Sequence, residues 1–572
     1  MTINTIHRSG LASLLALAAT MTACGDPDTP LPDDGEQTFV LPDPEGNWIL
    51  VDQIHTSKQN LDLKLERDNY AYQGMHGYHR LFKHLEARGY PYSQLSYTQS
   101  DERLTRAVLD GFKVLFINLV SSDRPDFTAA EIADVTEWVR AGGGLFIIAD
   151  HTNVYYHAQR INPILEPMGI KVTFHTALDR APEFSIAGGA WLKIKNWDRA
   201  HPISEGIKIA SFQTGGPFET DHGVAFLSPD GFGDFWQENP NDPGFYGNWS
   251  RDPGEPQGPL PVVAAAPFGP GRVAVVGDQN IFGDEWLLVA HNLELALNTF
   301  EWLADNENTP TPLRDTTLDD TFTVGLPLEQ SDWNIGINFC AGYFPFFINF
   351  NRQPRITARG ILDFDKDYDA LVFTDPSHTF SAGDLDRIKA HLDADKPLVI
   401  LTDLTRARQG SVQLIQELVP EFSVDGLQGP LTAANLPASA DHIETVLSET
   451  EFPILSDTLD LAGLRMSGHT YPTGVACPEG VADAIPTMRR VRATFGTPFL
   501  QAELPDGTLT DVARRTQRPQ GGQIIVFLQD GFWRNETLGA ERQMPTPDTQ
   551  GAHHIEYRFH DWLITQGPGA LE

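Results

Sequence analysis

The feature that most constrains this chain is an internal repeat. Residues 127–150 read as a helix followed by a short apolar strand that ends in Asp, and residues 380–403 read the same way, 253 positions later and without a gap. Thr128 and Glu131 have the spacing of a helix-capping box, which Ser381 and an acid three residues further on repeat. Each copy therefore predicts a helix that packs on a strand with a carboxylate at its end.

Two later landmarks keep the same order in both halves. Pro202–Ile203 corresponds to Pro453–Ile454, and the apolar run 271–276 corresponds to 522–527, both at an offset of 251. Chance likeness between two amphipathic helices would not preserve the order of so many landmarks. The sequence therefore predicts a tandem duplication, in which matching strands occupy matching positions in two related sheets.

Short apolar runs alternate with amphipathic helical patterns within the first copy. Continuous apolar strands are typical of a parallel sheet covered on both faces, and right-handed crossovers make such a sheet doubly wound. We therefore expect two tandem α/β domains with doubly wound, mainly parallel sheets. Residues 176–260, rich in Gly, Pro and Asp, are interpreted as a long excursion over the carboxyl edge of the sheet. Besides the repeated helix, the first copy predicts strands at 48–51, 94–97, 114–119, 145–149 and 171–174, and helices at 77–89, 101–109 and 162–168.

The N-terminus carries an export signal. An apolar run from Leu11 to Ala19 follows a weakly basic start and is too short to span a bilayer. Its end at Cys24, followed by a Pro- and Asp-rich tether, resembles a bacterial lipoprotein signal. The resemblance implies cleavage before Cys24 and diacylation of that residue, with a plain secretory peptide as the alternative. The implied location is the cell envelope, at the outer membrane or cell surface rather than the inner membrane, with the membrane bound through the N-terminal lipid.

These patterns divide the chain into five segments. The Pro-, Thr- and Asn-rich stretch after residue 305 has the composition of an extended connector between the two copies. The segments are a signal peptide at 1–23, a tether at 24–45, domain 1 at 46–305, a linker at 306–320 and domain 2 at 321–568.

Charge and cysteine content limit the partners and the covalent links. The chain has 77 acidic and 41 basic residues and a formal charge of −36, which would repel a polyanion. We therefore expect no nucleic-acid partner. Cys340 and Cys477 are the cysteines that remain after Cys24, and in an oxidising compartment they are candidates for a disulfide. Two buried, unpaired thiols are the alternative.

Domain 1 resembles the class I glutamine amidotransferase-like, or flavodoxin-like, fold. The resemblance rests on the run from Gly142 to His151, on residues 201–206, and on residues 271–278 with His291 opening the last helix. It is more closely similar to uncharacterised exported bacterial proteins and transport-associated domains built on that fold. Amidotransferases carry a nucleophilic Cys on the turn after the Gly run, where this chain has Asp150. With no Cys in domain 1, glutamine hydrolysis through a thiolate is excluded.

Several polar residues follow the predicted strands of domain 1. Ligands of doubly wound sheets sit beyond the carboxyl ends of the strands, so these residues are expected to converge there. Asp beside His can make a general base, and mixed Asp and His ligands suit a divalent metal, although no motif of diagnostic spacing requires one. The candidate catalytic residues are Asp52, His55, Asp150, His151 and Asp278. The candidate ligand-binding residues are Asn153, His157, His222, Asn280 and His291.

The two halves differ at these positions. Domain 2 keeps Asp403 at the place of Asp150 but has Leu404 at the place of His151, so a reactive site is expected only in domain 1. The leading interpretation is a lipid-anchored envelope protein whose first domain binds a small polar or glycan-like ligand, with hydrolysis by an Asp/His site as its activity. The alternatives are a non-catalytic binding or scaffold lipoprotein and a transport-system accessory, in which the Asp residues cap helices and the His residues fill loops.

Overall fold

The computed structural model describes two compact units, one made of the described residues before 305 and the other of those after 320. The signal, the tether, the linker, Cys24, Cys340 and Cys477 lie outside the described residues. No helix in the described part of the chain combines the length and the apolar character needed to cross a membrane. The described residues are 49–56, 78–95, 103–187, 189–236, 246–283, 286–304, 321–335, 342–353, 355–362, 364, 367–404, 408–424, 444–446, 452–461, 464–466, 488–519, 521–534, 538 and 547–567.

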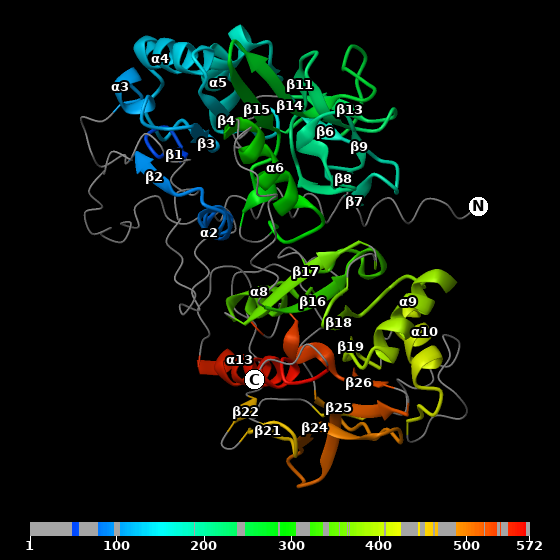
Figure 1. The fold of residues 1–572 in the computed structure, drawn as a ribbon. Coiled ribbons are helices and arrows are strands. Elements are labelled where there is room, and N and C mark those ends of the chain that lie inside the picture. Colours follow the sequence, from blue (N-terminus) through cyan, green and yellow to red (C-terminus); the bar gives the residue numbers. More distant parts are fainter. Residues whose placement is uncertain are drawn as a thin grey trace. The chain divides into compact units, whose positions relative to one another are not determined.

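The main sheet of the first unit has eight strands in the order β2-β1-β3-β4-β15-β14-β12-β9 (Figure 1). The first five strands are parallel to one another, and the last three continue the sheet in antiparallel fashion. The order confirms a doubly wound, largely parallel α/β fold. The bounds are β2 Tyr92–Leu95, β1 Ile49–Asp52, β3 Val114–Ile117, β4 Gly144–Ile148, β15 Gly271–Val276, β14 Pro261–Phe268, β12 Gly223–Phe226 and β9 Asn196–Trp197.

Helices cover both faces of this sheet, because its strands are apolar on both sides. Leu115 and Leu145 belong to the core under α4 and α5, while Phe116 and Phe146 point to the other face and pack with Phe300 of α6. Helix α2 joins that second face through its own phenylalanine ring. The bounds are α2 His79–Ala87, α3 Arg106–Leu109, α4 Ala129–Arg140, α5 His157–Leu165 and α6 Asn292–Ala304.

The expected capping box starts helix α4. Thr128 Oγ1 accepts from the Glu131 amide, and Glu131 Oε2 accepts from the Thr128 amide at 2.8 Å. The strand that runs under this helix needs a glycine at its start. A Cβ at Gly271 would lie 1.9 Å from the carbonyl oxygen of Val139, so only a residue without a side chain lets helix and strand approach this closely.

The region expected to be an excursion is more ordered than predicted. It contributes β12 and β9 to the main sheet, and it forms the small sheet β10-β8-β7 and the ribbon β13-β6. The predicted strand at 171–174 is the short β5 of a separate ribbon with β11, and the predicted helix at 101–109 is the single turn α3 within the described residues. The bounds are β5 Lys171–Val172, β6 His175–Leu178, β7 Ser185–Ala187, β8 Trp191–Ile194, β10 Ala210–Gln213, β11 Phe218–Glu219 and β13 Phe232–Phe235.

The second unit repeats the architecture of the first. Its nine-stranded sheet has the order β17-β16-β18-β19-β26-β25-β24-β21-β22, again with five parallel strands followed by antiparallel ones (Figure 1). The bounds are β16 Phe322–Pro327, β17 Ile356–Ile361, β18 Ala370–Thr374, β19 Leu398–Leu401, β21 Phe452–Leu455, β22 Arg465–Met466, β24 Thr497–Glu503, β25 Leu509–Arg518 and β26 Gly521–Phe527, with helices α8 Phe344–Arg352, α9 Ala382–Asp393, α10 Gln409–Leu418 and α13 Pro547–Leu563.

The strand register confirms the duplication. Ile148 of β4 pairs with Val276 of β15, and Leu401 of β19 pairs with Phe527 of β26. Leu401 follows Ile148 by 253 positions, and Phe527 follows Val276 by 251 positions, which are the offsets of the repeat. Each unit therefore places its repeated strand fourth in the sheet, beside the strand that the second landmark forms.

Candidate functional site

A pair of buried carboxyl groups lies at the carboxyl edge of the first sheet. Asp150 follows β4 by two residues and Asp278 follows β15 by two residues, and the last residues of these two strands pair directly. Asp150 is 3% exposed and Asp278 is fully buried. The sequence predicted both residues at this edge, and the parallel pairing of their strands brings them together.

Burial and mutual repulsion hold protons on this pair. Burial raises the pKa of Asp278 to about 7, although its carboxylate oxygens accept from the amides of Gln213, at 2.5 Å, and Asn280, at 2.8 Å. Burial, and then the nearby charge of Asp278, raise the pKa of Asp150 well above its ordinary range. Two like charges in one dry site cannot both be stable, so the pair retains a proton near neutral pH.

His157 supports Asp150 from the following helix. Its Nε2 accepts from the Asp150 amide at 3.1 Å, and its Nδ1–H donates to the Val154 carbonyl at 2.9 Å. These two bonds require one neutral tautomer, and burial lowers the pKa of His157 to about 4. His157 therefore fixes the turn after β4, which differs from the ligand-binding role expected from the sequence.

His151 lies against the same carboxyl group and is buried, although a site residue after the end of a strand would be expected to be exposed. It is 4% exposed, and its ring stacks on Tyr246 with centroids 4.4 Å apart. Its amide donates to Asp150 Oδ1 at 2.6 Å, and its Nε2 lies 3.8 Å from the same oxygen. Burial lowers the pKa of His151 to about 3, so its imidazole is neutral and can accept a proton only from a strong or buried donor.

The turn that carries His151 is strained. Thr152, Tyr155 and Tyr156 have φ values of 48°, 53° and 62°, in the left-handed region that side chains rarely adopt. Gly216 packs against this turn so closely that a Cβ there would lie 2.6 Å from the Asp150 carbonyl oxygen. Such strain persists only where the surrounding structure enforces it, and it concentrates at functional sites.

Two buried amide groups beside Asp278 have unused hydrogen-bonding atoms. Gln213 Nε2 and Asn280 Oδ1 lack a hydrogen-bond partner among the described residues, although the two residues are 4% and 6% exposed. The other end of the Asn280 amide donates to the Gln213 carbonyl at 3.2 Å. A donor and an acceptor left open next to a carboxyl pair match a hydroxyl group or a water molecule, which donates and accepts at once.

The remaining pair of predicted catalytic residues forms a separate cluster. His55 Nδ1 is 2.9 Å from Asp52 Oδ2, its Nε2 is 3.7 Å from Glu131 Oε1, and its ring stacks on Phe127 at 3.8 Å. Strand β3 separates β1 from β4, and no described contact joins this cluster to Asp150. Among the described residues, the five catalytic candidates therefore form two groups at this edge, and their convergence on one ligand stays a prediction. The sequence had shown Glu131 only as a capping residue, because nothing local indicates that its second oxygen faces His55.

Three of the predicted ligand-binding residues have other roles or positions. Asn153 is buried and its side chain bonds to Gln159 at 3.3 and 3.5 Å, which holds the turn. His291 bonds through Nδ1 to the Ile209 carbonyl at 3.1 Å. His222 is exposed on the turn before β12, beside Gly169, and lies apart from the carboxyl pair. Of that predicted set, Asn280 is the residue that donates its backbone amide to Asp278 and keeps a side-chain oxygen without a partner among the described residues.

The mixed Asp and His residues do not form a metal site in the described part of the chain. No group of three or more His, Cys, Asp or Glu residues there is arranged to hold a metal ion. The reason is local: Asp278 and Asp150 accept backbone amides, and His157 uses both ring nitrogens on backbone groups. The chemistry that this arrangement supports directly is proton transfer by the carboxyl pair.

The second unit has lost the carboxyl pair. Gln529 occupies the position that corresponds to Asp278. Its backbone forms an isolated antiparallel β-bridge with Asp403, which occupies the position that corresponds to Asp150. Asp403 forms an ion pair with Arg489, and Leu404 is buried in the core, where the first unit has a histidine. The two halves therefore differ in the surroundings of these positions, and the expectation that only the first unit holds a reactive site stays a prediction.

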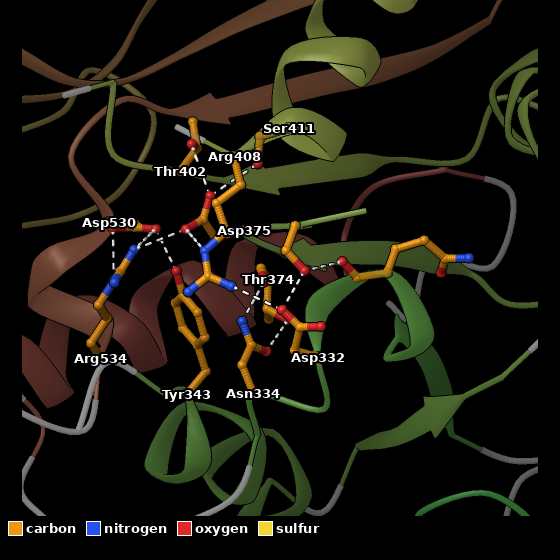
Figure 2. A network of polar contacts seen from close by, with 12 residues as sticks. Asp332, Asn334, Tyr343, Thr374, Asp375, Thr402, Arg408, Ser411, Asp530 and Arg534 are labelled. Carbon is orange, nitrogen blue, oxygen red and sulfur yellow. Dashed lines mark hydrogen bonds and ion pairs between the residues drawn. The ribbon is translucent and has the colours of Figure 1, made fainter. Parts of the chain in front are cut away.

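Another polar network, which sequence reasoning missed, lies at the carboxyl edge of the second sheet (Figure 2). Arg534 pairs with Asp530 at 3.0 Å and with Asp375 at 3.3 Å, and Tyr343 donates to Asp530. Arg408, at the start of α10, reaches Asp375 at 3.5 Å from the exposed side. Burial raises the pKa of Asp375 to about 6. The arginines largely neutralise the buried acids, so the network reads as a structural ion-pair cluster.

The chain was compared with protein families and with known proteins. Residues 75–300 match the model of a domain of unknown function, DUF4350. The search of curated proteins gave no match. Among solved structures, a ThuA-like protein from Bacteroides uniformis has a TM-score of 0.29 at 12% identity, over 50% of this chain and 99% of that one. A ThuA-like protein from Parabacteroides merdae has a TM-score of 0.27 at 11% identity, over 47% and 93%.

A third solved structure, the mmIFT52 N-terminal domain, has a TM-score of 0.33 at 17% identity, over 46% of this chain and 99% of that one. Likenesses at this level say nothing about activity. The finer resemblance to exported lipoproteins stays a prediction. The protein is thus a tandem α/β chain that carries a DUF4350 match in its first unit and is structurally similar to ThuA-like proteins.

Proposed function

We propose that the first unit binds a small polar, glycan-like ligand at the carboxyl edge of its sheet and hydrolyses it with Asp150 and Asp278. The observation that carries the proposal is the buried carboxyl pair, which holds a proton near neutral pH. A pair of this kind supplies an acid and a base at one place without a metal ion. The unpartnered amide atoms of Gln213 and Asn280 would orient a hydroxyl beside it.

The reaction balances with water as the only co-reactant. The ionised carboxylate accepts a proton from water while the water oxygen bonds to the carbon that is attacked. The protonated carboxyl donates its proton to the leaving oxygen as the bond between that carbon and oxygen breaks. The neutral imidazole of His151, whose amide is bonded to Asp150, helps to position this carboxyl.

The proposed location of the protein rests on its N-terminal sequence. The export signal and Cys24 support a lipid-anchored protein of the cell envelope, at the outer membrane or cell surface. A glycan-like ligand would be available there, and the acidic surface does not oppose an uncharged one.

The proposal is tested with a panel of 4-nitrophenyl glycosides and the purified mature protein. Asp150→Asn and Asp278→Asn should each lower kcat by about 100-fold or more, because each removes one of the two proton-transfer groups. Asp403→Asn changes the corresponding residue of the second unit and should leave the rate unchanged. Release of nitrophenol at the same rate by all three variants would refute the hydrolase.

One observation favours the alternative of a non-catalytic binding or scaffold protein. Asp150 and Asp278 are both nearly inaccessible to solvent, and the backbone at Gly216 packs directly against the turn that carries Asp150. A buried carboxyl pair can instead stabilise the ends of β4 and β15 by accepting hydrogen bonds from nearby backbone amides. In that case the two Asn variants would change the unfolding midpoint, and the wild-type protein would release no nitrophenol from any glycoside.

A further inference from the structure

An open pocket lies at the β9 edge of the first sheet, four strands away from β4. Its volume is about 420 Å³, which falls within the range of roughly 300–1,000 Å³ that small-molecule sites occupy. Strands β9 and β12 and the loop before β14 form its walls. Its lining includes Lys195, Arg199, Trp197, Phe226, Pro229 and Pro259.

The charge of this pocket is opposite to that of the chain. Lys195 and Arg199 line it and no acidic residue does, although the protein carries a formal charge of −36. Arg199 is exposed, and one of its NH groups is held by the Ile207 carbonyl, which points the guanidinium along a fixed direction. The neighbouring acid Asp198 lies outside the lining and accepts from the Ala200 amide at 3.0 Å. Two cations on one wall attract a carboxylate, and a guanidinium can bind it through two hydrogen bonds.

Apart from Asn196, the rest of the lining is apolar. Trp197 is 9% exposed, and its Nε1–H donates to the Ile194 carbonyl at 3.1 Å, which fixes the plane of the ring. Phe226 is partly exposed, and two exposed proline rings complete the wall. Aromatic and prolyl faces can pack against the C–H faces of a sugar ring, and a simple inorganic anion offers no such face.

We propose that this pocket binds an acidic saccharide, a pyranose ring that carries a carboxylate. The carboxylate pairs with Arg199 and Lys195, and the ring rests on the Trp197 side of the pocket. This site lies outside the carboxyl pair and does not depend on the proposed hydrolysis. It gives an acidic protein one place where an anionic glycan is favoured.

Binding is measured by saturation-transfer NMR and titration with three probes: galacturonate, its neutral analogue galactose, and a tetraglutamate peptide. Galacturonate should bind about tenfold more tightly than galactose, which corresponds to about 1.4 kcal/mol, since hydrogen bonds to a charged group are stronger than those between neutral groups. The double variant Lys195→Gln, Arg199→Gln should lose that advantage. Lys208→Gln, which removes an exposed cation elsewhere in the same unit, should keep it.

Several results would overturn the proposal. Galacturonate that fails to bind, or that binds no better than galactose, would show that the two cations do not recognise it. Tetraglutamate that binds as tightly would show simple attraction of carboxylates without recognition of a sugar. Asp278→Asn is expected to leave galacturonate binding intact, so a failure of the hydrolase proposal and a failure of this one are separable.

Discussion

Asp278→Asn should change how the stability of the first unit depends on pH. The pKa of Asp278 is about 7 in the folded protein against an ordinary value of 3.8. A carboxyl whose folded pKa is raised contributes stability that is complete below its unfolded pKa and is lost as pH rises through the folded pKa. Between about pH 5 and pH 7 the unfolded carboxyl is ionised while the folded one is mostly protonated, so Asp278 costs the wild type about 2–3 kcal/mol across this interval.

The variant removes this pH-dependent cost, and the loss of the Asp278 charge also makes the pKa of Asp150 less raised, which changes stability with pH in the same direction. The variant also adds a constant cost. The introduced asparagine side chain would present an amide nitrogen to the donor of either Gln213 or Asn280, where an oxygen of Asp278 now accepts. That mismatch lowers stability by about 1–3 kcal/mol at every pH. The free energy of unfolding of the variant, relative to wild type, should therefore rise by about 2–3 kcal/mol from about pH 5 to pH 7.

The stability of the variant is compared with that of the wild type because two buried histidines, His151 and His157, change stability with pH in the opposite direction. Burial lowers the pKa of His151 to about 3 and that of His157 to about 4, so their contributions to stability are lost as pH falls below about 6.5. Both proteins share these contributions, which cancel in the difference.

The assay is urea unfolding of the mature protein, with the two units distinguished by hydrogen–deuterium exchange of peptides from β4 and β19. Asp221→Asn, which changes an exposed carboxyl of the first unit, is the matched control and should show a constant difference across pH. A constant difference for Asp278→Asn as well would mean that Asp278 is ionised in the folded protein. The basis of the acid–base proposal would then be gone.

Three further predictions concern His151, the lipid anchor and the ion-pair network of the second unit. His151→Ala should lower turnover of a hydrolysed glycoside about 100-fold and cost about 1–2 kcal/mol through its lost stacking, whereas Leu404→Ala should cost about 2–5 kcal/mol in urea unfolding and leave turnover intact. Cys24→Ser should release the protein from membranes in fractionation, and a mature N-terminus at another residue, found by mass spectrometry, would contradict the lipid anchor. Arg534→Met should cost about 3–5 kcal/mol because it removes the buried cation that pairs with both Asp530 and Asp375, and Arg408→Met about 1 kcal/mol or less because that residue is 40% exposed; equal losses would contradict the assigned network.

Much of the fold could be predicted from local patterns. The repeat at offsets of 253 and 251 established that there are two related sheets, and the register of β4 with β15 and of β19 with β26 agrees with it. The capping box at Thr128 and the buried strands were also predicted correctly, because each depends on residues close in sequence. The short strands between 176 and 260 were missed, since Gly- and Pro-rich segments show no clear period.

The candidate site was predicted only in part, for a related reason. Sequence placed Asp150 and Asp278 at one edge, because parallel strands end on the same side of a sheet. Sequence could not show that Asp52 and His55 stay apart from them, since that depends on strand β3 lying between β1 and β4.

Burial, finally, was decided by the tertiary structure. The raised pKa of Asp278 requires the exclusion of water by the surrounding segments, and it persists although the amide of Gln213, 65 residues away, donates to this carboxyl and lowers its pKa. The pairing of Arg534 with Asp375 joins residues 159 positions apart and has no local signal at all. Residue types and periods follow from the sequence. Desolvation and through-space charge depend on which distant segments pack together, and these two quantities shift the pKa of a buried carboxyl group.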